Sequence, residues 1–406
     1  MSTPNVSRKL LFSAPVVVAA LGYFIDVYDL LLFNIVRVPS LKALGYSDAD
    51  VSEFGAYVYN WQQAGLLLGG FLWGVLGDRL GRRSVLFASI LTYSLANIAC
   101  GFVGSVESYS LLRFIAGIGL AGELGAGITL ISEILPREIR GLGAALVAGV
   151  GLAGTIVAYF AVKMTDWRMA YFIGGGMGIG LLGLRLNVLE SHLFSRTSGQ
   201  KRGQWWTLIT RRDRLFRYLR CMGIALPTYL VIGIYATFGN EIADALGITG
   251  VVAATCVLYT YIGIVSGDIF SGVLSQWLGS RRKAIGYMLL ATLLITLVLL
   301  SGWLQTAAQL YFCYTLLGFS IGYIAMFLTT TAEQFGTNLR ATVTTSVANN
   351  VRATVLVTLP AFQFLKPFTG TLSAAALVGA FCFLLAFVSL FAMEETFGKN
   401  LDFEEE

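Results

Sequence analysis

The stretch GVLGDRLGRR, at residues 74–83, has a second copy in GVLSQWLGSRRK at residues 272–283, which begins 198 residues further along the chain. Each copy closes the second apolar run of its half of the chain and leads into a block of basic residues. The first copy contains Asp78, whereas the second has Gln276 in its place. A motif repeated at matched positions indicates two halves with the same internal order.

A second motif repeats in the same way. Glu133 and Arg140, seven residues apart, recur as Glu333 and Arg340 after the fourth apolar run of each half. Two repeated motifs predict parallel six-span repeats. Such repeats imply two helical bundles related by a pseudo-twofold axis along the membrane normal, with a site between them.

The composition places the chain in a membrane. Hydrophobic residues make up 56% of the 406 residues and charged residues only 13%, whereas soluble domains carry roughly 25% charged residues. This excludes a cytosolic enzyme, a disordered chain and a secreted disulfide scaffold. A bilayer core needs about 20 apolar helical residues to cross it. Twelve apolar runs meet that length: 11–35, 54–76, 84–103, 109–135, 141–162, 167–189, 220–238, 250–274, 284–304, 309–335, 343–365 and 370–393.

The positions of Lys and Arg predict the orientation in the membrane. Most basic residues lie on the side that also holds both termini and the long connection between the halves. The positive-inside rule therefore places both termini in the cytoplasm, in a multi-pass protein of the inner (plasma) membrane. We expect an N-terminal six-helix bundle over 1–190, a cytoplasmic basic linker over 191–219 and a C-terminal six-helix bundle over 220–406.

Three short motifs carry a resemblance to a known family. Residues 77–83, GDRLGRR, look like the loop signature of the major facilitator superfamily. Residues 26–29, DVYD, with Asn34 resemble the first span of phosphate:proton symporters and, in looser form, of aromatic-acid:proton symporters. Residues 122–125, GELG, resemble metabolite:proton symporters. The resemblance implies an all-α membrane protein with 12 transmembrane helices in two six-helix bundles, which transports by rocking-bundle alternating access.

Several ionisable residues lie inside the predicted spans, where each costs at least roughly 2.5–3.5 kcal/mol. At a rise of 1.5 Å per residue, Asp26 in the first span and Arg113 in the fourth reach similar depths near the outer edge of the core. We therefore expect an Asp26–Arg113 pair as the proton switch, with Asp29, one turn further out, competing for the Arg. Glu123 is a second proton candidate or a substrate ligand. The alternative is a static pair that fixes helix packing.

Arg352 lies near the middle of the eleventh span, with Asn349 one turn before it on the same face. A midplane Arg with amide neighbours suits a carboxylate or a phosphate, so we predict an anionic substrate. The alternative is an Arg neutralised by a protein carboxylate. The polar residues that could line a cavity, or instead form interhelical hydrogen bonds, are Tyr57, Asn60 and Gln63 in the second span and Tyr235 in the seventh.

The repeated loop motifs predict a cytoplasmic gate. Arg82 can reach Glu133 at the end of the fourth span, and Asp78 can meet the positive end of a helix dipole. We expect Asp268, deep in the eighth span, to pair with Arg352 or Arg340. The predicted gate residues are Asp78, Arg82, Glu133, Arg140, Asp268, Glu333 and Arg340.

These features favour a secondary active transporter that takes up a small organic anion together with protons, as a monomer surrounded by membrane lipid. The alternatives are an inorganic phosphate:proton symporter, an organic-cation or drug exporter, and a non-transporting membrane receptor. One His, five scattered Cys and the lack of a Walker A run argue against an enzyme. We expect no cofactor, no metal and no nucleic-acid partner.

Overall fold

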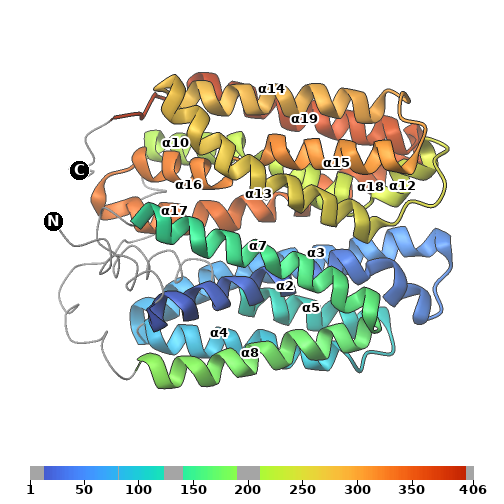
Figure 1. Cartoon of the computed structure of the whole chain (residues 1–406), viewed down its shortest axis with the longest axis horizontal. Helices are drawn as coiled ribbons and strands as arrows, with labels where there is room; N and C mark the ends of the chain where they lie inside the picture. Colours follow the sequence, from blue (N-terminus) through green and yellow to red (C-terminus); the bar gives the residue numbers. More distant parts are fainter. Residues whose placement is uncertain (1–12, 81, 123–139, 190–210, 399–406) are drawn as a thin grey trace. The chain divides into compact units, whose positions relative to one another are not determined.

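A computed structural model gives the structure of the chain and describes residues 13–80, 82–122, 140–189 and 211–398 (Figure 1). All regular elements in these four ranges are helices. They form two compact units, which we call the N-terminal unit (Met1–Arg202) and the C-terminal unit (Gly203–Glu406). The boundary between the units falls inside the segment that the sequence predicts to be a linker.

The N-terminal unit consists of long apolar helices. They are α2 (Ala14–Ala43), α3 (Asp48–Leu80), α4 (Arg82–Cys100), α5 (Val106–Leu120), α7 (Arg140–Met164) and α8 (Trp167–Leu189). α5 starts after Ser105, whose hydroxyl accepts a hydrogen bond from the backbone N–H of Ser108 and so caps the helix. Within this unit, α2 packs on α7, α3 packs on α5, and α4 packs on both α5 and α8.

The C-terminal unit has shorter segments because some of its helices are broken. They are α10 (Arg212–Ile224), α11 (Leu226–Leu230), the π-helix η1 (Val231–Ala236), α12 (Gly239–Ala245), α13 (Ala253–Leu278), α14 (Arg281–Leu300), α15 (Ala307–Ile321), α16 (Ile324–Glu333), α17 (Thr337–Ala353), α18 (Val355–Thr369) and α19 (Thr371–Ala392). Here α13 packs on α15, α14 packs on α15 and α19, and α10 packs on α17 and α19.

The packing of the second unit repeats that of the first. In the N-terminal unit α3 contacts α5, and in the C-terminal unit their counterparts α13 and α15 make the same contact. A Cβ atom on Gly65 would collide with the backbone oxygen of Phe114, and one on Gly263 would collide with that of Thr315. Gly263 lies 198 residues after Gly65, the offset of the repeated loop motif. The sequence repeat therefore has a counterpart in three dimensions.

This close approach gives a prediction about stability. A Cβ atom on Gly318 would collide with the backbone of Thr260, whereas Gly272 has nothing within 4 Å of its Cβ position. Overpacking of this kind costs typically about 1–3 kcal/mol. We therefore expect Gly318→Ala to lower the thermal unfolding temperature in detergent and Gly272→Ala not to lower it. Equal unfolding temperatures for the two variants would contradict the described packing of α13 on α15.

Five helical stretches in the described ranges are long and apolar enough to cross a membrane, or six if a bent pair counts as one span. The bent pair is Arg212–Ile224 with Leu226–Ala236, at 44°. The five stretches are Val16–Ala43, Ala253–Leu278, Arg281–Leu300, Ala307–Glu333 and Thr371–Ala392. The protein is thus a multi-pass membrane protein, and the full set of twelve spans in two bundles stays a prediction.

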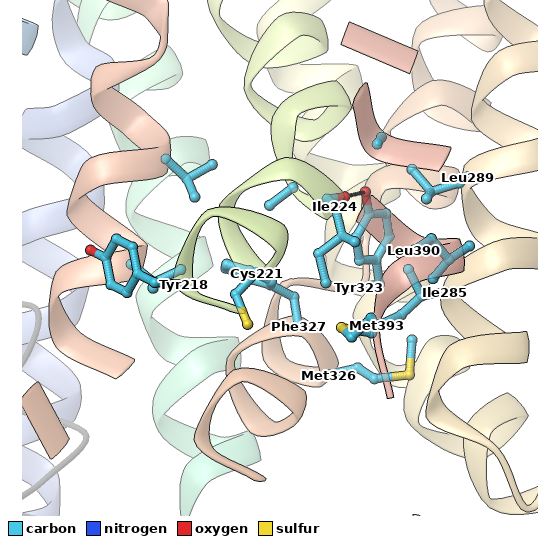
Figure 2. Packing of buried hydrophobic residues seen from close by; sticks show 14 of the residues in the cluster. Tyr218, Cys221, Ile224, Ile285, Leu289, Tyr323, Met326, Phe327, Leu390 and Met393 are labelled. Carbon is cyan, nitrogen blue, oxygen red and sulfur yellow. Dashed lines mark hydrogen bonds between the residues drawn. The ribbon is translucent and has the colours of Figure 1, made fainter. Parts of the chain in front are cut away.

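The core of the C-terminal unit connects two breaks in its helices (Figure 2). α10 ends at Ile224, shortly before Pro227, which has no backbone N–H to donate. The hydroxyl of Tyr323 donates a hydrogen bond of 2.8 Å to the Ile224 carbonyl. Tyr323 itself lies in the break between α15 and α16. The break after α10 leaves the buried Ile224 carbonyl without a helical hydrogen bond, and Tyr323 supplies one from the break between α15 and α16. Backbone groups inside a membrane need such partners because no water is available.

Candidate functional site

Arg113 lies fully buried in the N-terminal unit and has neighbours from four other helices. Its Nη1 donates to the Asn97 Oδ1 of α4 at 2.9 Å, and its Nε donates to the Gln62 Oε1 of α3 at 3.3 Å. Its Nη2 donates to the backbone oxygen of Asp29 on α2 at 3.1 Å. The guanidinium also lies 5.6 Å from the ring centre of Tyr171 on α8. One charged group thus holds α2, α3, α4 and α5 together.

Asp29 is the acidic neighbour of this guanidinium. Its side chain is fully buried and its charge interacts with that of Arg113. Neither carboxylate oxygen has a hydrogen-bond partner among the described residues. The Asn97 amide lies beside this carboxyl group but without the geometry of a hydrogen bond. A buried carboxylate next to a fixed cation, with its own oxygens unoccupied, is a group that can exchange a proton.

The expected pairing of Asp26 with Arg113 is wrong. No hydrogen bond or ion pair joins these two described side chains, and Asp29, the competitor, takes the place beside the Arg. Asp26 is buried elsewhere on α2, and the Arg185 guanidinium of α8 lies against Gly22, one turn before it. Three residues along a helix of 3.6 residues per turn leave the two acidic residues about 60° apart around the axis and about 4.5 Å apart along it. Depth alone therefore does not tell which of them faces α5.

Tyrosines surround this charged pair within the N-terminal unit. The Tyr109 hydroxyl lies 2.6 Å from that of Tyr171 and donates to the Ser40 Oγ at 3.4 Å. The Tyr28 hydroxyl donates to the backbone oxygen of Ala170 at 2.8 Å. All three tyrosines are fully buried. These bonds connect α2, α5 and α8 around the pair.

The C-terminal unit has a neutral counterpart of this arrangement. Tyr314 occupies the position 201 residues after Arg113, as Thr315 does for Phe114. Its hydroxyl donates to the backbone oxygen of Tyr235 at 2.8 Å, where Arg113 donates to a backbone oxygen of α2. The charged pair is therefore a feature of the N-terminal unit within the described part of the chain.

Tyr235 was expected to line a cavity, and the structure places it in the protein interior. Its side chain is fully buried and its hydroxyl donates to the Ala375 backbone oxygen at 3.0 Å. It also belongs to the π-helix η1. These contacts match the alternative of an interhelical hydrogen bond.

The polar residues of α3 divide between surface and interior. Tyr57 is 45% exposed and packs edge-on against Trp61. Gln63 is buried, and its Oε1 has no hydrogen-bond partner among the described residues, as is also true of the Asn60 Oδ1. Sequence reasoning missed Gln62, which holds Arg113 and also donates to the Leu30 carbonyl at 3.1 Å.

Arg352 stands near the end of α17 in the C-terminal unit. Its Nε donates to the Tyr229 hydroxyl at 3.2 Å, and its side chain is partly exposed. The buried Oδ1 of Asn349, one turn earlier, has no hydrogen-bond partner in the part of the chain that the structure describes. Asn350 instead donates to the Tyr218 hydroxyl at 2.7 Å. A partly exposed guanidinium can bind an anion with two or more hydrogen bonds.

Of the two partners predicted for Asp268, Arg352 is wrong, whereas Arg340, whose side chain lies outside the described residues, stays a prediction. Asp268 caps α16 instead, because its Oδ1 accepts a hydrogen bond of 2.9 Å from the backbone N–H of Ala325. No contact joins the described side chains of Asp268 and Arg352. The first N–H groups of α16 have no partner within the helix, and they lie at the positive end of its dipole. A carboxylate accepts a hydrogen bond from such an N–H group and also interacts favourably with the dipole.

Variants of Asp268 separate its capping role from a role as a charge. Asn keeps an acceptor oxygen for the Ala325 N–H, whereas Ala removes it. Loss of a helix cap costs typically about 0.5–2 kcal/mol. We expect Asp268→Ala to lower the thermal unfolding temperature and Asp268→Asn to lower it much less. If both variants are equally destabilised, the charge and not the cap is what α16 needs.

Glu333 joins three segments at one end of the C-terminal unit. Its Oε1 lies 3.4 Å from the Arg281 Nη2 and its Oε2 accepts a hydrogen bond of 2.7 Å from the Thr396 hydroxyl. Arg281 also donates to the Ser275 Oγ at 3.0 Å and lies over the Phe397 ring. The partner of Glu333 is therefore Arg281 of the repeated loop motif. The remaining predicted sites, Glu123, Glu133 and the side chains of Asp78, Arg82, Arg140 and Arg340, lie outside the described residues.

Glu395 fastens the segment after α19 to the start of α14. Burial works to raise the pKa of Glu395, but hydrogen bonds from the Ser280 hydroxyl and from the backbone N–H groups of Phe397, Arg281 and Arg282 outweigh it. The pKa of this carboxyl group therefore lies below its ordinary value of 4.5. A depressed pKa means that the ionised form stabilises the fold at neutral pH, and that this contribution disappears as the pH falls through the folded-state pKa.

Glu395→Gln tests this contribution. We expect a lower thermal unfolding temperature than wild type at about pH 7 and a shrinking difference as the pH falls below about 4.5, the ordinary pKa of the group. The difference is small because the carboxylate is largely exposed to solvent. A difference that stays constant over this pH range would show that hydrogen bonds independent of charge hold the segment.

The described part of the chain is thus a helical membrane protein with ionisable groups held inside it. It belongs to the Major Facilitator Superfamily, because the family model with that description matches residues 19–353.

Relatives with transport names support the same membership. The niacin transporter of Acinetobacter baylyi is 32% identical over 39% of this chain and 36% of its own length. The sialic acid transporter of Escherichia coli is 25% identical over 68% of this chain and 67% of its own length. The gentisate transporter of Corynebacterium glutamicum is 24% identical over 64% of this chain and 60% of its own length. The chain covers 49% of the length of a Bacillus subtilis protein named as a niacin/nicotinamide transporter and 36% of the length of the Acinetobacter baylyi niacin transporter.

Proposed function

We propose that this protein is a secondary active transporter that takes up a small organic anion together with protons across the inner membrane. The observation that carries the proposal is the buried Asp29–Arg113 pair in an apolar helical unit. In this proposal, twelve spans form two six-helix bundles that alternate their access to the two sides, and both termini lie in the cytoplasm. The family membership supports the transport class.

The substrate class rests on Arg352 and on the relatives. A guanidinium recognises a carboxylate through two parallel hydrogen bonds. The Tyr229 hydroxyl accepts a hydrogen bond from the Arg352 Nε and so orients the guanidinium. Niacin, sialic acid and gentisate, after which three relatives are named, are all carboxylic acids. We infer that the substrate is a small carboxylate that Arg352 holds through its charge.

The position of Asp29 supports the proposed proton coupling. Arg113 holds the Asp29 backbone and not its carboxylate, so the carboxylate can gain and lose a proton while the guanidinium stays in place. Protonation leaves Arg113 as an uncompensated charge, which changes how α2 and α5 attract each other. A proton carried with a carboxylate also makes the net translocation electroneutral. A static pair would keep the same charge throughout the cycle.

Proteoliposomes that contain the purified protein test the proposal. We expect labelled nicotinate to accumulate when the outside is more acidic than the lumen, and not to accumulate when the pH is equal on both sides. Nicotinamide, a neutral analogue of similar size, should show no such accumulation. Accumulation of nicotinate without a pH gradient, or equal handling of the two compounds, would contradict proton-coupled anion uptake. Inorganic phosphate in the same assay tests the phosphate symporter.

A further inference from the structure

We propose that Asn97 is a positioning residue that transmits the protonation state of Asp29 to Arg113. The proposal rests on the proposed function, because it assigns a further residue to the proton switch. Asn97 lies on α4, fully buried, between the acidic residue of α2 and the guanidinium of α5. Sequence reasoning gave it no role, because it is one amide within an apolar run.

The orientation of the Asn97 amide is fixed by its partner. An arginine side chain only donates hydrogen bonds, so the group of Asn97 that contacts Arg113 must be the oxygen. The 2.9 Å bond from Arg113 Nη1 to Asn97 Oδ1 satisfies this requirement. The amide nitrogen therefore points away from the guanidinium. It is buried, and no described group accepts a hydrogen bond from it.

Asp29 offers the acceptors that this nitrogen lacks. Its carboxyl group lies beside the Asn97 amide, and both of its oxygens are buried without a hydrogen-bond partner in the described ranges. An unsatisfied buried polar group costs about 1–3 kcal/mol. The Asn97 N–H donor and the two Asp29 oxygens are adjacent and all lack a described partner. A small rotation of either side chain would therefore form a hydrogen bond between them.

The protonation state decides whether this contact closes. An ionised Asp29 only accepts hydrogen bonds and draws in the Asn97 N–H, so Asp29, Asn97 and Arg113 form one chain of hydrogen bonds across α2, α4 and α5. A protonated Asp29 has weaker acceptors, so the amide is released and α4 is no longer tied to α2. No direct carboxylate–guanidinium hydrogen bond is present, because Arg113 donates to the Asp29 backbone, so the amide is the connection between the two charges.

Glycine on the neighbouring helix leaves room for the movement. A Cβ atom on Gly174 of α8 would lie 2.5 Å from the Asp29 Oδ1, so any other residue there would restrict the carboxylate. Ser94, one turn before Asn97 on α4, is equally buried and its hydroxyl also has no described partner. Ser94 makes no contact with Arg113 and therefore provides the matched control position.

The test compares Asn97→Ala, Asn97→Asp and Ser94→Ala in proteoliposomes with nicotinate as the probe. We expect Asn97→Ala to reduce pH-gradient-driven accumulation by about tenfold or more, a loss of about 1.4 kcal/mol of coupling, with counterflow exchange within about threefold of wild type. Its counterflow should also lose the pH dependence of the wild type, which a merely structural residue would not alter. Asn97→Asp keeps the side-chain volume and the oxygen that Arg113 contacts but has no amide N–H for Asp29, so we expect the same loss of coupling. Ser94→Ala should behave like wild type.

The outcomes separate this inference from the proposed function. If Asp29→Asn abolishes coupling but Asn97→Ala and Asn97→Asp keep both coupling and the wild-type pH dependence, the role of Asn97 is refuted and the switch stands. Equal losses in Asn97→Ala and Ser94→Ala would also refute it, because they would report general packing of α4. If wild-type protein shows no pH-driven accumulation, the proposed function fails before the role of Asn97 arises.

Discussion

Asp29→Asn is expected to abolish pH-gradient-driven accumulation of nicotinate while leaving counterflow exchange intact. One proton per substrate sustains about tenfold accumulation for each unit of pH difference, since one pKa unit corresponds to about 1.36 kcal/mol. Asn is neutral and keeps the side-chain volume and the backbone oxygen that Arg113 contacts. The variant should therefore equilibrate nicotinate to a ratio of about one across the membrane. The measurement is the lumenal concentration at steady state, with protein-free vesicles subtracted.

Asp26→Asn is the matched control, because it makes the same chemical change three residues away on α2. Arg113 makes no hydrogen bond or ion pair with the described Asp26 side chain, so coupling should survive in this variant. If Asp26→Asn loses accumulation and Asp29→Asn keeps it, Asp26 is the carboxylate that carries the proton. If both variants accumulate nicotinate, neither acidic residue couples transport to protons.

Arg352→Ala is expected to raise the KM for nicotinate uptake by about 10- to 150-fold. A hydrogen bond to a charged group contributes about 1.5–3 kcal/mol, and Ala removes the guanidinium entirely. Arg352→Lys keeps the charge but loses the planar pair of donors, so its KM should lie between wild type and Ala. The measurement is the concentration dependence of initial uptake with the pH gradient held constant.

Tyr229→Phe provides the control for the Arg352 experiment. It removes the hydroxyl that accepts the Arg352 Nε without changing the charge or the ring. We expect a smaller rise in KM than for Arg352→Ala, because the guanidinium remains but is less well oriented. An Arg352→Ala variant with unchanged KM and a lowered unfolding temperature would show that Arg352 stabilises the fold and does not bind substrate. This is the result expected if a protein carboxylate neutralises Arg352.

The sequence predicts the helical class and the repeat because these depend on composition and spacing. The apolar runs predict helices, and the motifs at 74–83 and 272–283 predict halves with the same order. The contacts of Gly65 and Gly263 with backbone oxygens show the same repeat in the packing. Small residues allow helices in membranes to approach closely, so glycines at matched positions of the two halves indicate where helices pack.

The details of the site depend on helix rotation and on breaks, which depth does not reveal. Asp29 and not Asp26 lies beside Arg113, because a step of three residues turns a side chain by about 60° and moves it about 4.5 Å along the helix. Gln62 holds Arg113 in the same way, while its neighbour Gln63 does not. Asp268 caps α16 because the chain breaks at 322–323, and nothing in the local sequence places that break opposite it.

Proton movement during nicotinate uptake tests the central claim most directly. Vesicles loaded with a pH-sensitive dye and held at equal pH on both sides report any proton that enters with the substrate. Wild-type protein should acidify the lumen when nicotinate is added outside, in proportion to the nicotinate taken up. Nicotinate uptake with no acidification would contradict the assignment of Asp29 as the group that carries protons through the membrane.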